Sequence, residues 1–200
     1  MPTIQELRSS IKRDIPSIGT WMQIPSSDIA EILSSTLSYD WIAIDMEHGC
    51  FSKNDLSSII RSISLNKVLP FVRLQTKNIS SVKNIVDFGF SGYIIPMIET
   101  KQELINIKNE ILYPPLGNRG VGFSRSNQYG INFKKAITNK ENPFIVSMIE
   151  TQKGLENLEE IVSTSFLDAI LIGPYDLSAS LGVCGEFESS TFQDAYQMIK

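Results

Sequence analysis

The sequence predicts an α/β fold in which parallel strands alternate with helices. Six short apolar runs recur along the chain, and a segment with helical spacing follows each of them. Residues that are apolar at successive positions are typical of strands buried on both faces. The predicted strands span residues 18–23, 41–45, 69–74, 92–97, 144–149 and 169–172.

Two helix starts are indicated by their capping residues. Ser52 precedes an apolar stripe with i, i+3, i+4, i+7 spacing, and Asp55 lies in the first turn, where it favours the helix dipole. Thr100 and Glu103 form a capping box, in which each side chain satisfies a free backbone N–H. Shorter stripes predict helices around residues 82–86, ended by Gly89, and around 155–162 and 192–199.

A (β/α)₈ barrel and a doubly wound open sheet both fit this alternation. An open sheet usually carries a glycine-rich phosphate loop after its first strand, but residues 24–27 here are Ile-Pro-Ser-Ser. A barrel instead places polar residues at the carboxyl ends of several strands, and this chain does so at four of them. We therefore predict a (β/α)₈ TIM barrel; the polar residues are His48, Arg73, Glu150 and Asp176.

Only six β/α units can be counted, and a closed barrel needs eight. We therefore expect residues 1–200 to form a single barrel domain that lacks the last one or two units, from a protein of roughly 250 residues. The missing strands would leave two strand edges unpaired.

Composition excludes several classes of function. A net charge of −4 and a pI near 5.1, without a basic run, argue against a nucleic-acid partner. The sequence has no apolar stretch of membrane-spanning length and no secretion signal at its start. Two distant cysteines, Cys50 and Cys184, do not suggest a disulfide framework. We expect a cytoplasmic protein.

Two candidates for chemistry follow neighbouring predicted strands. His48, the only histidine, lies next to carboxylates that would raise its basicity. A lone histidine is often structural, but the position of this one favours an acid–base role. Arg73 ends an apolar strand, where its charge must be paired or used on a ligand. A buried ion pair and a role in holding a carboxylate or enolate oxygen both fit.

Two carboxylates, Glu150 and Asp176, follow adjacent strands and would repel each other without a positive group between them. A divalent cation such as Mg²⁺ or Mn²⁺ fits these oxygen ligands, with Co²⁺ or Zn²⁺ as alternatives. An ion-pair network at the barrel rim is the other interpretation. None of the six strands contains the lysine that Schiff-base chemistry needs. The long segment 113–130 is predicted to be an ordered loop over the mouth of the site.

Together these segments resemble the HpcH/HpaI aldolase family, the metal-dependent class II pyruvate aldolases. The resemblance runs from Gly19 to Lys200 and rests on motifs in a fixed order. The motifs are Gly19-Thr20-Trp21, Asp45-Met46-Glu47-His48, Pro70-Phe71-Val72-Arg73, Ile95-Pro96-Met97, Tyr113-Pro114-Pro115, Arg119-Gly120-Val121-Gly122, Ile149-Glu150-Thr151 and Ile172-Gly173-Pro174-Tyr175-Asp176-Leu177-Ser178.

The resemblance implies a barrel of the phosphoenolpyruvate/pyruvate type, with its last helix exchanged between subunits of a homo-oligomer, usually a hexamer. It implies a divalent metal held by Glu150 and Asp176, and a substrate carboxylate received by the backbone N–H groups of Tyr175 and Asp176. Arg73 would stabilise the enolate, and His48 would act as acid and base, oriented by Asp87.

One position departs from the family pattern. The best-known members carry a substrate-contacting glutamine two residues before the metal-binding glutamate, where this chain has Met148. The leading hypothesis is reversible cleavage of a 4-hydroxy-2-oxo acid into pyruvate, or a related 2-oxo acid, and an aldehyde. The alternatives are an oxaloacetate-type decarboxylase, or a related enzyme that forms carbon–carbon bonds at the same site, and a non-catalytic binding module.

Overall fold

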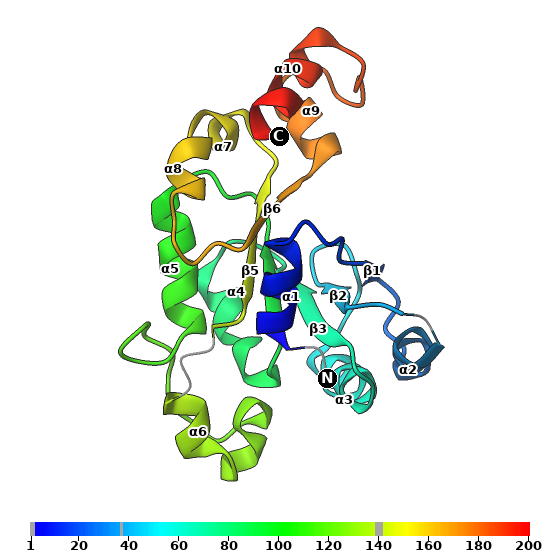
Figure 1. Cartoon of the computed structure of the whole chain (residues 1–200), viewed down its shortest axis with the longest axis vertical. Helices are drawn as coiled ribbons and strands as arrows, with labels where there is room; N and C mark the ends of the chain where they lie inside the picture. The colour runs from blue at the N-terminus through cyan, green and yellow to red at the C-terminus, as the bar shows by residue number, and fades with distance from the viewer. Residues whose placement is uncertain (1–2, 37, 139–141) are drawn as a thin grey trace.

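Six parallel strands form one sheet in the order of the chain (Figure 1). The computed structural model describes residues 3–36, 38–138 and 142–200. Each strand hydrogen-bonds to the next, as consecutive β/α units require. All six predicted strands are confirmed; they are β1 (Gly19–Met22), β2 (Trp41–Asp45), β3 (Leu69–Arg73), β4 (Gly92–Ile95), β5 (Phe144–Ile149) and β6 (Ala169–Ile172).

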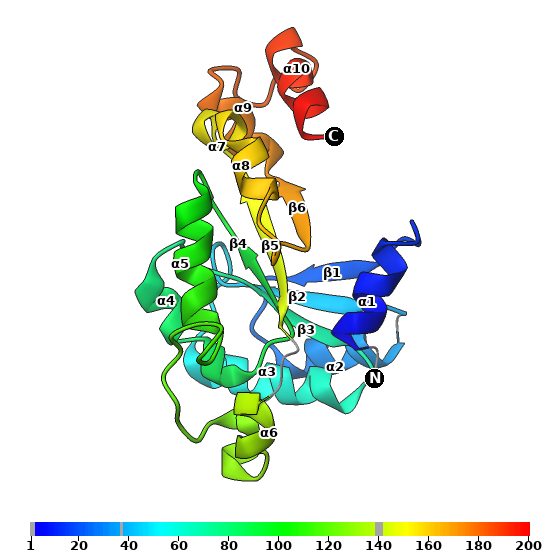
Figure 2. The same cartoon turned by 60° about the vertical axis from the view of Figure 1, so that its left-hand side comes forward.

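The sheet curls strongly from one edge to the other. Figure 2 shows β1 to β3 running across the molecule while β5 and β6 stand nearly upright. All six residues of β5 are buried, whereas every residue of β6 is partly exposed, as expected for an edge strand. The arrangement is six strands of a (β/α)-barrel, which confirms the predicted fold class.

Helices cover the outer face of the sheet and begin at the predicted caps. Ser52 and Thr100 both form capping boxes, with Asp55 and Glu103 respectively. The helices that follow the six strands in turn are α2 (Ser27–Thr36), α3 (Lys53–Leu65), α4 (Ile79–Lys83), α5 (Lys101–Ile111), α7 (Gln152–Glu156), α8 (Leu158–Val162), α9 (Pro174–Ser180) and α10 (Ser190–Ile199). Of these, α9 and α10 lie beyond the carboxyl ends of β5 and β6 (Figure 2).

Two of the predicted helices are interrupted. The stripe around residues 82–86 belongs to α4 and a separate 3₁₀ turn, η1 (Val86–Phe88), which Gly89 ends in the left-handed conformation at φ 79°. The stripe around 155–162 is divided between α7 and α8 because Asn157 leaves the helical conformation at ψ 13°. An apolar stripe indicates which face of a helical segment is buried. Two short helices that follow one another can bury the same face, so the stripe does not indicate the break between them.

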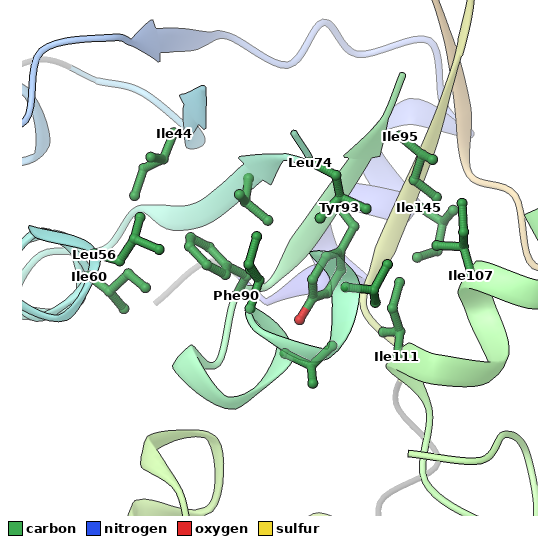
Figure 3. Close-up of a cluster of buried hydrophobic side chains, with 14 of the residues drawn as sticks. Ile44, Leu56, Ile60, Leu74, Phe90, Tyr93, Ile95, Ile107, Ile111 and Ile145 are labelled. Atoms are coloured by element: carbon green, nitrogen blue, oxygen red, sulfur yellow. The ribbon is translucent and has the colours of Figure 1, made fainter. Parts of the chain in front are cut away.

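The larger core lies between the sheet and the outer helices (Figure 3). Strand residues such as Ile44, Tyr93 and Ile145 meet helix residues such as Leu56 and Ile107 there. No helix in the described part of the chain is long and apolar enough to cross a membrane.

A second, smaller core fills the inner face of the sheet, against α1 (Ile4–Ile11). Leu7 of α1 packs with Phe71 and Phe144. Arg8 fastens the helix to the strand ends, because its Nε and Nη2 atoms lie 2.6 and 2.8 Å from the carboxylate of Asp168. Its side chain also donates to the backbone carbonyls of Asn142 and Pro143.

Segment 113–130 does not cover the site, and that prediction is wrong. It belongs to the connection from the end of α5 to the start of β5, so it lies at the amino ends of the strands. The 3₁₀ segment η2 (Arg125–Gly130) ends it, and the helix α6 (Phe133–Thr138), which follows, lies at the opposite end of the molecule from α9 and α10 (Figure 1). The length and turn residues of the segment indicated order, but not which end of the barrel it occupies.

Candidate active site

Acidic and basic side chains gather at the carboxyl ends of the strands. Arg73 ends β3, Glu150 directly follows β5 and Asp176 lies in the first turn of α9, after β6. The charges of Arg73, Asp176 and Glu47 all act on Glu150, which places the four groups in one electrostatic cluster. The structure therefore brings Arg73, Glu150 and Asp176 together, as the sequence predicts.

Arg73 forms a two-point ion pair with Asp45. The strand register sets the two residues side by side, since Asp45 of β2 is the partner of Arg73 of β3. The Nε and Nη2 atoms of Arg73 lie 2.8 and 2.6 Å from the two carboxylate oxygens. Both interpretations of Arg73 remain compatible, because the pair uses two of the five guanidinium N–H donors.

Asp45 is fully buried and organises the turn that follows β2. Its carboxylate accepts hydrogen bonds from the Gln23 side chain at 2.7 Å and from the backbone N–H groups of Glu47 and His48 at 3.1 and 3.2 Å. Burial alone would raise the pKa of Asp45, but the hydrogen bonds from Arg73, Gln23 and His48 outweigh it and hold the pKa at about 2. Asp45 is therefore ionised, and it fixes the position of the Arg73 guanidinium group relative to the turn that contains His48.

Two further side chains, Trp21 and Glu47, contact the guanidinium group of Arg73. Trp21 of β1 lies against it, with its ring centre 5.0 Å from the guanidinium carbon. Nη1 lies 3.1 Å from Oε2 of Glu47, a salt bridge without hydrogen-bond geometry. Burial raises the pKa of Glu47, Arg73 and His48 oppose that effect, and the charges of Asp45 and Asp176 add to it.

Glu150 is the most enclosed acid of the cluster after Asp45, with 2% of its surface exposed. Its Oε2 atom accepts a hydrogen bond from the backbone N–H of Met97 at 2.7 Å. Burial raises the pKa of Glu150, the Met97 hydrogen bond opposes that effect, and the nearby charges of Glu47 and Asp176 raise it further. A cation beside Glu150 would reverse the mutual repulsion of these acids.

His48 is exposed in the turn after β2, at the carboxyl edge of the sheet. Asp87 lies in η1, before the start of β4, and thus at the amino ends of the strands. Its carboxylate accepts a hydrogen bond from Nη2 of Arg119 at 2.8 Å. Asp87 and His48 of one chain therefore lie at opposite ends of the strands. The role of Asp87 in orienting His48 stays a prediction.

The other predicted substrate contacts are Tyr175, Asp176 and Met148. The side chain of Tyr175 is exposed and packs edge-on against Phe187, with ring centres 5.0 Å apart. The backbone N–H groups of Tyr175 and Asp176 are in the first turn of α9, where a helix leaves its N–H groups without intrahelical partners. Met148 is buried in the inner core, on the same side of β5 as Val146.

Three residues of the cluster were given no role by sequence reasoning: Gln23, Asp45 and Glu47. Asp45 and Glu47 belong to the motif around His48, but they were read there only as neighbours of the histidine. The signal that points to Asp45 is the start of the two neighbouring strands, because pairing Trp41 with Leu69 also pairs Asp45 with Arg73.

The donor set fits a hard divalent cation that keeps several water or substrate ligands. Among the described residues, no group of three or more His, Cys, Asp or Glu side chains forms a complete metal cage. Mg²⁺ is commonly held by only one or two carboxylates, with the remaining positions filled by water and substrate. Glu150 and Asp176 are the candidate pair for such a site.

A curled parallel sheet with a buried acid and a fixed arginine at its carboxyl edge is the arrangement of a (β/α)-barrel enzyme. Residues 17–200 match the model of the HpcH/HpaI aldolase/citrate lyase family. The 5-keto-4-deoxy-D-glucarate aldolase of Escherichia fergusonii is 34% identical over 186 residues, which cover 91% of this chain and 71% of that protein. The chain belongs to the HpcH/HpaI aldolase/citrate lyase family, as the sequence motifs indicated, and is a carbon–carbon lyase.

Solved structures support the same assignment. An HpcH/HpaI aldolase/citrate lyase family protein from Burkholderia cenocepacia J2315 superposes with a TM-score of 0.89 at 29% identity, over 96% of this chain and 78% of that one. An HpcH/HpaI aldolase from Desulfitobacterium hafniense DCB-2 gives 0.85 at 25% identity, over 96% and 75%.

Proposed function

We propose that the protein is a divalent-metal-dependent aldolase that reversibly cleaves a 4-hydroxy-2-oxo acid into pyruvate, or a close relative, and an aldehyde. The observation that carries this proposal is the charge balance at the carboxyl edge. Asp45 already neutralises Arg73, and three further acids, Glu47, Glu150 and Asp176, surround the same space. Such a cluster favours a bound cation and an anionic substrate that shares it.

Glu150 and Asp176 would hold the metal, for which Mg²⁺ and Mn²⁺ are the best candidates. Once bound, a divalent cation supplies Lewis-acid polarisation of a 2-oxo acid. The backbone N–H groups of Tyr175 and Asp176 would receive the carboxylate of the substrate. Met148 offers only an apolar surface in this region, so the 2-oxo acid is anchored without the amide that the best-known family members use.

Arg73 and His48 would stabilise the enolate and transfer the protons, respectively. The N–H donors of Arg73 that Asp45 leaves free would stabilise the negative charge that develops on the enolate oxygen. His48, exposed beside them, would take the proton from the 4-hydroxyl group as the C3–C4 bond breaks and return a proton to C3. Asp45 prepares both groups because it binds the guanidinium and the backbone N–H of His48.

Exchange of the C3 protons of pyruvate with solvent deuterium, followed by NMR, tests this function without knowledge of the aldehyde. We expect exchange with Mg²⁺ or Mn²⁺ and none with a chelator. Arg73→Ala should slow it about 10²–10³-fold, while Arg61→Ala, an exposed arginine on α3, should not. Absence of exchange with every divalent metal would contradict the proposal, and loss of CO₂ from oxaloacetate without aldol cleavage would favour the decarboxylase.

A role for Asp87 beside His48 requires a second copy of the chain, because the two residues lie at opposite ends of the strands. We propose that the protein acts as a homo-oligomer in which Asp87 of one copy approaches His48 of another. Mixing inactive His48→Asn and Asp87→Asn chains during refolding should then restore up to about a quarter of the wild-type activity, since some sites regain both residues. If Asp87 acts within its own chain, mixing restores nothing, and if Asp87 has no role, Asp87→Asn chains are active without mixing.

A further inference from the structure

The two oxygens of Glu150 meet two backbone features that the reaction scheme does not use. Oε2 accepts the Met97 N–H at 2.7 Å. Oε1, together with Cγ and Cδ, lies so close to Gly173 that a Cβ at this position would overlap all three atoms. One oxygen thus accepts a hydrogen bond from the loop after β4. The other faces Gly173, directly after β6, and Asp176 follows Gly173 by three residues.

Met97 holds its N–H in place with an unusual backbone conformation. Its φ is 56°, in the left-handed region that a large side chain rarely enters. Strain of this kind persists only where the surroundings fix it, and it concentrates at functional sites. The side chain itself is 37% exposed, so packing of the methionine does not explain the conformation.

The loop after Met97 is fixed from several directions. Ile98 is fully buried. The Glu99 carboxylate accepts a hydrogen bond from Lys77 at 3.1 Å and pairs with Lys153 at 3.5 Å. The Glu99 carbonyl accepts another from the Asn157 side chain at 2.8 Å. These contacts tie the loop to the segment after β3 and to α7 and α8, which holds the Met97 N–H in position.

We propose that Met97 and Gly173 are positioning residues for the metal ligand Glu150. The left-handed Met97 directs its N–H to Oε2, and the absent Cβ at position 173 leaves room for Oε1, which is thereby presented to a divalent cation together with Asp176. This inference rests on the proposed metal-dependent function. In this proposal the segments Ile95-Pro96-Met97 and Ile172-Gly173-Pro174 act through their backbone geometry, and not through the chemistry of their side chains.

Binding of Mn²⁺ to the purified protein, followed by electron paramagnetic resonance, tests the proposal without an activity assay. Met97→Val keeps the N–H, but its branched side chain resists a positive φ, whereas Met97→Gly adopts that φ freely. We expect Met97→Val to weaken Mn²⁺ binding about 10–100-fold, the usual effect of losing a partner that orients a ligand. Met97→Gly should bind Mn²⁺ as the wild type does. The reverse order would show that the methionine side chain matters, and would overturn the proposal.

Gly173→Ala gives an independent second arm. We expect a loss of about 10–100-fold in Mn²⁺ affinity, while Gly120→Ala, whose Cβ would meet no atom within 4 Å, leaves the affinity unchanged. Circular dichroism of each variant without metal verifies that it is folded. Wild-type protein that binds no Mn²⁺ would overturn the metal-dependent function and this inference together. Wild-type binding that Met97→Val and Gly173→Ala leave intact would overturn this inference alone.

Discussion

Replacement of Asp45 by asparagine removes the charge that neutralises buried Arg73 while it keeps the size of the side chain. Loss of one partner of a buried ion pair typically costs about 3–5 kcal/mol. Arg73 retains 11% side-chain exposure and keeps Glu47 at 3.1 Å, so we expect the lower end of this range, about 3 kcal/mol, at neutral pH.

The dependence of this loss on pH follows from the low pKa of Asp45. The pKa falls from an ordinary 3.8 to about 2 in the folded protein. At about 1.4 kcal/mol for each pKa unit, the full difference is worth about 2.5 kcal/mol, of which about 2 kcal/mol is lost by pH 2. Because the folded-state pKa is the lower one, this stability is present above pH 4 and disappears as the pH falls towards 2. The wild type should therefore exceed Asp45→Asn by about 3 kcal/mol at pH 7 and by only about 1 kcal/mol at pH 2.

Urea unfolding followed by circular dichroism, at several pH values between 7 and 2, measures this difference. Asp194→Asn, an exposed aspartate on α10, is the matched control and should stay within about 0.5 kcal/mol of the wild type. A difference between wild type and Asp45→Asn that does not change with pH would refute the reasoning, because the Asp45 pKa would then be the same in the folded and unfolded states.

Three further outcomes are expected. Arg73→Lys should lower kcat about 10²–10³-fold with a smaller change in KM, because lysine cannot form the two-point pair with Asp45; steady-state kinetics with metal present measures both. Glu150→Gln should abolish Mn²⁺ binding without lowering the thermal unfolding midpoint in chelator, since it removes a buried charge among like charges; a lower midpoint would contradict this. Arg8→Ala should reduce the free energy of unfolding by about 2–3 kcal/mol in urea, with kcat unchanged, because the Asp168 carboxylate, far from the site, loses its charged partner and keeps only the hydrogen bond from the backbone N–H of Ile145.

The fold could be predicted from sequence because its signals are local and repeated. Each strand is a continuous apolar run. Each connection between strands is long enough to contain a helix, and such connections join parallel strands. Helix breaks were missed where the break does not disturb the apolar stripe, as at Asn157 between α7 and α8. The placement of segment 113–130 was missed, although the alternation of elements implies it, because a connection from a helix to the next strand always returns to the amino ends of the strands.

The candidate site residues were recognised where a single charged residue interrupts or follows an apolar pattern. Arg73, Glu150 and Asp176 each stand at a strand end, and the structure gathers them. The role of Asp87 could not be judged from the sequence, because its distance from His48 depends on which end of the barrel η1 occupies. Asp45 needed a further step, the register between β2 and β3, which only the pairing of two strands reveals.

The geometry around Glu150 lies beyond any pattern in the sequence. Helix and strand propensities describe residues in common backbone conformations, and Met97 adopts a rare one. Nothing in the local sequence requires a positive φ at a methionine; the requirement comes from a carboxylate 53 positions later that needs a donor at 2.7 Å. Buried polar groups must find partners, so the loop after β4 adopts the conformation that supplies one. A strained residue of ordinary type, next to a buried acid at the carboxyl edge of a barrel, is therefore a structural sign of a ligand-positioning contact.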